Sequence, residues 1–177
     1  PANGTEFDVE CSFWIAVDGH TVPQDPEALM LSGSFHPVPA VVGVNRNEGN
    51  VIAYSEWPGP VAPAEFRRAV AQLMGSRGSA ATPQDVSDVL AAYPARSADD
   101  LRSVWGQLLG DYLFICRSRR FLRLHQRARG APAAFEFVFA QRAQRDPAPE
   151  DWGVYHSSEL PFVFGPNESG SIRRVPA

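Results

Sequence analysis

His156 is the side chain in this sequence best suited to acid–base chemistry near neutral pH. It lies in a loop-like segment that begins at Gly153, with Glu159 three residues further on and an apolar Phe-Val-Phe run behind it. Because the unperturbed pKa of histidine is about 6.5, the imidazole can act first as a base and then as an acid. A carboxylate bound to its Nδ1 proton would orient the ring, and the sequence offers Glu48 and Glu159. The residues by themselves do not rank one acid above the other.

Two predicted strands would position Glu48 and His156. The run 39–44 is β-branched without polar alternation, as in a strand buried on both faces, and a turn containing Glu48 follows it directly. A second strand over 135–139 is aromatic and β-branched, and the polar loop 141–152 leads from it to His156. Reactive groups in open α/β sheets collect at the carboxyl ends of the strands. We therefore expect Glu48 and His156 to meet in space although they are far apart in the sequence.

Helical patterns account for most of the chain outside these strands. A short helix is expected around 26–31, and apolar residues at helical spacing indicate another over 63–74. Thr82 has the pattern of an N-cap followed by proline at the first helical position and an acidic residue at the third, and Pro94 ends that helix. Strands separated by long helical stretches favour the α/β class over a sandwich.

Two further helices are expected before the second strand. Ser97 is a candidate N-cap for the first, which carries an apolar face over 101–109. Gly110 and Asp111 are expected to interrupt it, with Asp111 capping a helix that runs to Gly130. We interpret the arginines of this last helix as a solvated face over a core-facing stripe, rather than as an anion site, because the chain is acidic overall. The arginines are Arg117, Arg119, Arg120, Arg123, Arg127 and Arg129, and the stripe is Leu113, Phe114 and Phe121.

Composition sets limits on the class of protein. The 177 residues are 44% hydrophobic, enough for one domain with a core, and the net charge of −4 argues against a nucleic-acid partner. No apolar run approaches the roughly 20 residues of a membrane span. Cys11 and Cys116 lack metal-ligand spacing, and a single disulfide and two free thiols both stay open. We expect no metal and no cofactor, and localisation is left open.

Four segments carry a resemblance to a known family. Residues 17–19 with 22–23 resemble the block P-V-x-D-G-x-x-x-P, and 42–49 resembles G-x-N-x-D-E-G. Residues 111–116 resemble D-x-x-F-x-C-P, and 153–165 resembles G-x-x-H-G-x-E-L-x-F-V-F-G. Together these blocks are similar to the C-terminal part of the type-B carboxylesterases, a family that includes the cholinesterases and many microbial esterases and lipases.

The resemblance implies roles for the three residues singled out above. Glu48 would be the acid and His156 the base of a Ser-Glu-His triad, and Glu159 would support the site from behind. The chain would then be the C-terminal portion of a single α/β-hydrolase domain over 1–177, incomplete at both ends, containing the last strands of the central sheet with flanking and inserted helices. His20, His36 and His125 match no catalytic position of the family.

Departures from the family pattern bear on substrate scope. Ala16, Asn47 and Arg117 replace a proline, an aspartate and a proline, and Ser157 stands where glycine is customary beside the histidine. We expect the Ser157 side chain to crowd the acyl or alcohol pocket. Cys116 matches a cysteine that many members of the family bridge to a downstream partner.

The nucleophile of such a triad is not in this sequence. Neither a G-x-S-x-G elbow nor a glycine-rich oxyanion segment occurs among the 177 residues. We therefore expect a carboxylic-ester hydrolase acting on a small-molecule ester, whose serine lies in an upstream part of the same protein, and we expect these residues alone to be inactive. One alternative is a catalytically inactive, cholinesterase-like binding or adhesion module. Another is one chain of a nicked two-chain hydrolase.

Overall fold

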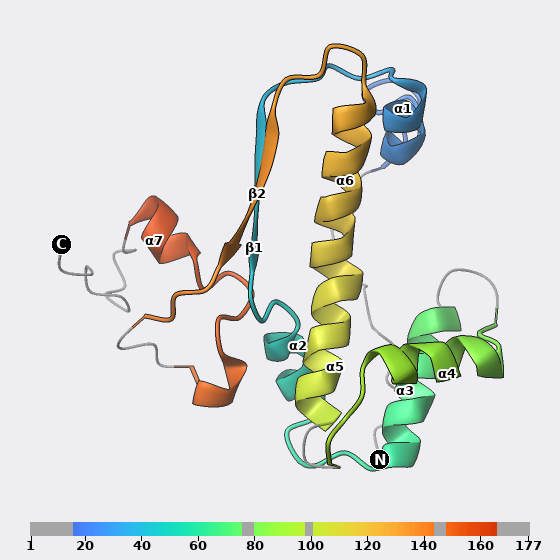
Figure 1. Ribbon diagram of the computed structural model, residues 1–177, viewed down its shortest axis with the longest axis vertical. Helices are drawn as coiled ribbons and strands as arrows, with labels where there is room; N and C mark the ends of the chain where they lie inside the picture. The colour runs from blue at the N-terminus through green and yellow to red at the C-terminus, as the bar shows by residue number, and fades with distance from the viewer. Residues whose placement is uncertain (1–15, 76–79, 98–100, 144–147, 166–177) are drawn as a thin grey trace.

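The computed structural model describes residues 16–75, 80–97, 101–143 and 148–165 (Figure 1). Cys11 lies outside the described residues. Residues 98–100, the first turn of the helix that Ser97 was expected to cap, also lie outside them. The elements, in chain order, are α1 (Pro26–Ser32), β1 (Ala40–Asn45), α2 (Asn50–Glu56), α3 (Pro63–Gly75), α4 (Pro83–Ala92), α5 (Leu101–Gly110), a π-helical segment η2 (Asp111–Ile115), α6 (Cys116–Arg127), β2 (Ala134–Phe139), a 3₁₀ turn η3 (Glu150–Trp152) and α7 (Leu160–Phe164).

The two predicted strands are confirmed and form a parallel pair. β1 and β2 run side by side in register from Ala40 opposite Ala134 to Asn45 opposite Phe139 (Figure 1). All the helices from α2 to α6 lie in the connection between them. The carboxyl ends of the strands therefore adjoin, and the segments carrying Glu48 and His156 leave the sheet from the same end.

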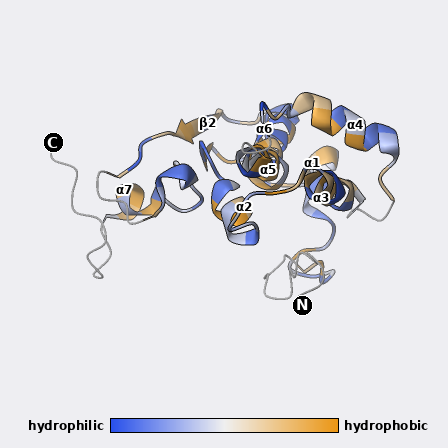
Figure 2. Cartoon of the chain, turned by 90° about the horizontal axis from the view of Figure 1, so that it is seen from below, coloured by the Kyte–Doolittle hydropathy of each residue, from blue (hydrophilic) through white to orange (hydrophobic). Residues whose placement is uncertain are grey.

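The expectation that β1 is buried on both faces is wrong for this chain. Helix α6 packs against one face of the pair, and the other face leaves Val41 70% and Phe135 63% exposed. Figure 2 shows β2 coloured as hydrophobic with α5 and α6 to one side of it. The run 39–44 has the apolar composition of an interior strand. In the described residues, however, a single layer of helices covers one face of the strand pair, and the other face is exposed.

Helices α5, η2 and α6 form one continuous column beside the sheet (Figure 1). The predicted interruption at Gly110 and Asp111 is wrong: Gly110 has helical angles (φ −58°, ψ −47°), and the column ends at Arg127 rather than at Gly130. Asp111 does not cap a helix, because its Oδ2 instead accepts a hydrogen bond from the Tyr93 hydroxyl at 2.7 Å. Glycine and aspartate disfavour a helix by only about 1 kcal/mol or less each, which tertiary packing overrides.

The core is built by helices α2 to α5. The indoles of Trp57 and Trp105 lie 5.3 Å apart between ring centroids, and Phe66 meets the Trp105 ring edge-on. The predicted cap of α4 is confirmed as a capping box, in which Thr82 and Asp85 each bond the other's backbone N–H. Such a box stabilises a helix by about 1 kcal/mol. This core holds α5 and the start of α2 rigidly beneath the end of β1.

The arginine face of α6 is confirmed as exposed, with Arg119 paired to Glu136 at 3.2 Å and Arg120 paired to Glu27. The expected apolar stripe is partly wrong, because Phe121 is 40% exposed and the buried residues of α6 are instead Leu122, Leu124 and His125. The π-helical segment adds a residue to a turn and rotates the following positions around the axis.

Candidate active site

Glu48 and His156 meet at the carboxyl end of the strand pair. The Nδ1 atom of His156 lies 2.8 Å from Oε2 of Glu48, which is hydrogen-bonding distance. The carboxylate is buried, with 7% of its side chain exposed, whereas 48% of the imidazole is exposed. Among the described residues, Nε2 has no hydrogen-bond partner. The pair thus presents a ring fixed on one nitrogen and free on the other.

The turn after β1 fixes both oxygens of Glu48. While Oε2 bonds His156, Oε1 accepts a hydrogen bond from the backbone N–H of Asn45 at 2.7 Å. A carboxylate held at both oxygens cannot rotate freely. The local sequence that follows the strand therefore sets the direction in which Glu48 faces its partner.

Close packing of glycines places this turn against α5. A Cβ atom added to Gly49 would lie 2.1 Å from the carbonyl oxygen of Gly106, and one added to Gly106 would lie 2.2 Å from Oδ1 of Asn50. Neither position has room for a side chain. The backbone that carries Glu48 therefore rests directly on the helix, without intervening side chains, and inherits the rigidity of the core.

Asn47 joins the turn of Glu48 to the segment of His156. Its backbone N–H donates to the carbonyl of Val154 at 2.9 Å, and the N–H of Val154 donates to its side-chain Oδ1 at 3.1 Å. Gly153, with φ +64°, lies so near that an added Cβ would be 2.4 Å from that Oδ1. These contacts join the segments that carry Glu48 and His156 across the end of the sheet.

Ser157, next to His156, adopts a left-handed backbone conformation with φ +72°. Among the described residues, Ser157 alone has a positive φ without being glycine. The left-handed backbone region favours glycine over residues with a Cβ by about 1–2 kcal/mol. Glycine, which the family pattern has at this position, would adopt this backbone conformation without strain. The departure at Ser157 places local strain immediately beside His156.

Phe114 packs against the imidazole. The two ring centroids are 4.5 Å apart at an interplanar angle of 31°. The sequence placed Phe114 in a core-facing stripe, but the π-helical segment η2 turns it towards His156. π-helical turns within α-helices are frequent at functional sites. Phe114 limits the tilt of the ring that Glu48 holds at its edge.

Glu159 lies behind the site and bonds Asn45 rather than Nδ1 of His156. Its Oε2 accepts a hydrogen bond from Nδ2 of Asn45, and the same Nδ2 donates to the carbonyl of Tyr155 at 2.8 Å. The geometry therefore ranks the two acids that the residues alone left equal, because Glu48 is the one bonded to the imidazole. Sequence reasoning missed Asn45, although a polar side chain ending an apolar strand was a usable signal.

The surrounding charges raise the pKa of His156. The hydrogen bond that Nδ1 of His156 donates to Glu48 is the largest cause of the raised pKa. Burial lowers the pKa, and the negative charges of Glu48 and Glu159 raise it further. A carboxylate bonded to the ring favours the imidazolium form. The site therefore makes His156 a stronger base than a free imidazole, with its open nitrogen directed away from Glu48.

The other histidines lie elsewhere. His20 and His36 are exposed, and His125 is buried in α6 with Nε2 2.7 Å from the carbonyl oxygen of Val38. Within the described residues, no group of three or more His, Cys, Asp or Glu side chains could hold a metal ion, and no helix has the length and apolarity to cross a membrane. Cys116 is exposed.

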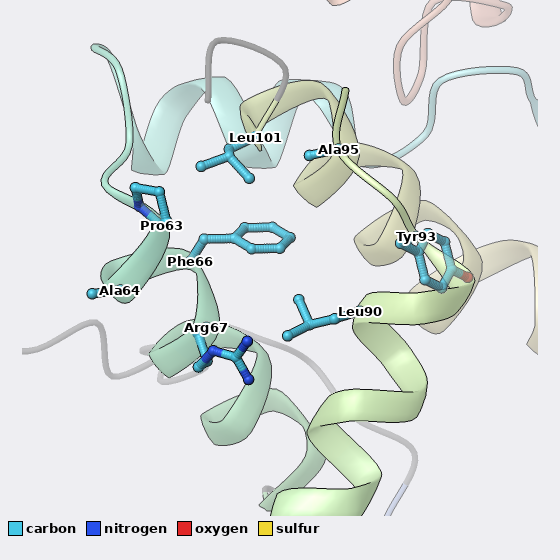
Figure 3. Close-up of a pocket in the computed structure, with 8 residues that line it drawn as sticks. All are labelled: Pro63, Ala64, Phe66, Arg67, Leu90, Tyr93, Ala95 and Leu101. Carbon is cyan, nitrogen blue, oxygen red and sulfur yellow. The ribbon is translucent and has the colours of Figure 1, made fainter. Parts of the chain in front are cut away.

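A separate cavity of about 440 Å³ lies between α3 and α4 (Figure 3). Phe66 points into it between Leu90 and Leu101, and Arg67 lies at its side. Its lining includes neither Glu48 nor His156. The cavity is therefore distinct from the acid–histidine pair.

Comparison with known proteins places these residues in a family. A family model described as "Carboxylesterase family" matches residues 3–174. The chain is 28% identical over 161 residues to "Acylcarnitine hydrolase" of Rattus norvegicus, covering 84% of this chain and 27% of that protein. It is 30% identical to "Crystal protein" of Dictyostelium discoideum (86% and 27%) and 30% identical to "Carboxylesterase 5A" of Canis lupus familiaris (87% and 27%). The chain thus spans about a quarter of the length of these relatives.

Proposed function

This chain belongs to the carboxylesterase family, and from that premise we propose that it carries the acid and the base of a carboxylic-ester hydrolase. Its parallel strands with helices between them are part of the α/β-hydrolase fold expected from the sequence. The observation that supports the assignment best is the 2.8 Å contact between Nδ1 of His156 and the buried Glu48, which leaves Nε2 open.

The proposed reaction uses the two ring nitrogens for different tasks. Nε2 of His156 takes the proton of a serine hydroxyl as its oxygen attacks the ester carbonyl, and then gives that proton to the departing alcohol. Nε2 then takes a proton from water as the water oxygen attacks the acyl-serine, and it returns that proton to the serine oxygen as the carboxylic acid is released. Glu48 keeps the proton of Nδ1 in place throughout and stabilises the imidazolium that forms in each step.

The serine and its oxyanion donors belong to sequence outside these 177 residues in this proposal. We take residues 1–177 as the C-terminal portion of a single α/β-hydrolase domain, consistent with the chain's coverage of 27% of its relatives. The exposed sheet face around Val41 and Phe135 is suited to cover from the rest of such a domain. Without a nucleophile or the donors that stabilise developing negative charge, these residues alone should be inactive.

The test is hydrolysis of a chromogenic short-chain ester by the complete protein. His156→Ala should lower kcat by several powers of ten, by analogy with triad removals, whereas His36→Ala, at an exposed histidine, should leave kcat unchanged. Covalent labelling of the serine by a fluorophosphonate should likewise be slowed strongly in His156→Ala and be unchanged in His36→Ala. If the complete protein neither turns over esters nor takes the label, the binding-module alternative replaces the hydrolase.

A further inference from the structure

Asn45 is a buried polar residue that contacts Glu48, Glu159 and the residue before His156. It is the last residue of β1 and is 1% exposed. Its backbone N–H donates to Oε1 of Glu48 at 2.7 Å, and its side-chain Nδ2 donates to both Tyr155 and Glu159. One buried residue thus contacts the acid, the second carboxylate and the residue immediately before His156.

We propose that Asn45 is a positioning residue: its side-chain amide holds Glu159 and the Tyr155 backbone in place, so that Glu48 alone bonds Nδ1 of His156. The inference rests on the proposed function, because it assigns to Asn45 the geometry that the hydrolysis requires.

The need for such a residue follows from the number of groups present. Two carboxylates lie near the imidazole, but Nδ1 has a single proton to donate. Glu48 is fixed by a backbone N–H, whereas the partner that fixes Glu159 is a side chain. Loss of the Asn45 amide would free Glu159 to compete for His156. It would also remove one donor to the Tyr155 carbonyl, which would keep its 3.0 Å hydrogen bond from the Ser158 N–H.

The separation of roles within Asn45 makes the proposal testable. Because the bond to Glu48 comes from the backbone, a substitution of the side chain leaves it in place and removes only the links to Glu159 and Tyr155. Aspartate is the sharpest replacement, since it keeps the shape of asparagine but has no N–H to donate when ionised.

The experiment measures kcat and KM of the complete protein in five variants: Asn45→Asp and Asn50→Asp, each alone and combined with Glu159→Gln, and Glu159→Gln alone. Asn45→Asp should lower kcat by about tenfold or more, with KM changed much less, because hydrogen bonds to charged groups are the strong ones. Adding Glu159→Gln reverses donor and acceptor between positions 45 and 159 while keeping the charge of the pair. The part of the lost kcat that is due to the freed carboxylate of Glu159 should return, whereas the bond to the Tyr155 carbonyl stays lost. The matched control is Asn50→Asp: Asn50 is 5% exposed but donates to the carbonyl of Asp151, so Glu159→Gln should restore nothing there.

A second readout separates this proposal from the proposed function. The downfield NMR resonance of the His156 Nδ1 proton reports its bond to Glu48 whether or not esters are hydrolysed. It should shift or broaden in Asn45→Asp, return in the double variant and persist in Asn50→Asp. Purely additive losses, or equal effects at positions 45 and 50, would overturn the proposal. If Asn45→Asp does not fold, Asn45→Ser takes its place. It should lower kcat and shift or broaden the resonance, and Asn50→Ser should leave the resonance unchanged. An unchanged kcat and resonance in Asn45→Ser would overturn the proposal.

Discussion

Replacement of Ser157 by glycine should stabilise the protein, although glycine normally does the opposite. Ser157 has φ +72°, where a residue with a Cβ is disfavoured by about 1–2 kcal/mol. Glycine relieves this strain but adds about 0.5–1 kcal/mol of unfolded-state entropy. The difference lies between about 0 and 1.5 kcal/mol, so the free energy of unfolding should rise by about 0.75 kcal/mol at the centre of that range.

Two comparisons isolate the backbone effect in urea unfolding followed by tryptophan fluorescence. Ser157→Ala keeps the Cβ and should be close to neutral. Ser87→Gly, at an exposed position inside α4, should lose about 0.5 kcal/mol by helix propensity. Glycine should therefore change the stability in opposite directions at the two serines. A loss of stability at position 157 as large as that at position 87 would refute the claim that Ser157 is strained.

Three further predictions concern the site. Gly106→Ala should destabilise the protein by about 1–3 kcal/mol in urea unfolding, because its Cβ would lie 2.2 Å from Oδ1 of Asn50, while Gly59→Ala, with nothing within 4 Å, should stay within about 0.5 kcal/mol; equal effects would remove the close approach as the cause. Phe114→Ala should lower kcat by roughly 2- to 10-fold, as expected for the loss of a ring contact worth about 0.5–1.5 kcal/mol, and an unchanged kcat would show that the ring does not restrain His156. The pKa of His156 is raised above 6.5, so kcat/KM should fall as the pH drops through that raised pKa; Glu48→Gln should move this fall to lower pH because it removes the largest cause, and an identical pH profile in Glu48→Gln would contradict the assignment. The charged pair stabilises the fold below the unfolded-state pKa of His156, and this stability should be lost as the pH rises through the folded-state pKa.

Local signals account for what the sequence predicted correctly. The apolar runs of β1 and β2, and the Thr82 cap of α4, depend on neighbours along the chain, and each is present in the structure. The meeting of Glu48 with His156 also followed from the rule for carboxyl ends of parallel strands, once both strands were recognised.

Tertiary contacts account for what the sequence did not reveal. The break expected at Gly110 is absent because that glycine packs against Gly49, which a local pattern does not show. Phe114 turned towards His156 through a π-helical turn that has no simple sequence signature. The role of Asn45 depends on partners more than a hundred positions away, and the strain at Ser157 is a backbone angle, visible only in three dimensions.

In the proposed mechanism Glu48, rather than Glu159, orients His156 for ester hydrolysis. The decisive measurement is kcat of the complete protein on one chromogenic ester for two variants, Glu48→Gln and Glu159→Gln. Glu48→Gln should lower kcat roughly 10⁴-fold, as for removal of the acid from a Ser-His-Asp triad, and Glu159→Gln should lower it by less than about tenfold. A larger loss in Glu159→Gln than in Glu48→Gln would show that Glu48 is not the acid that orients His156.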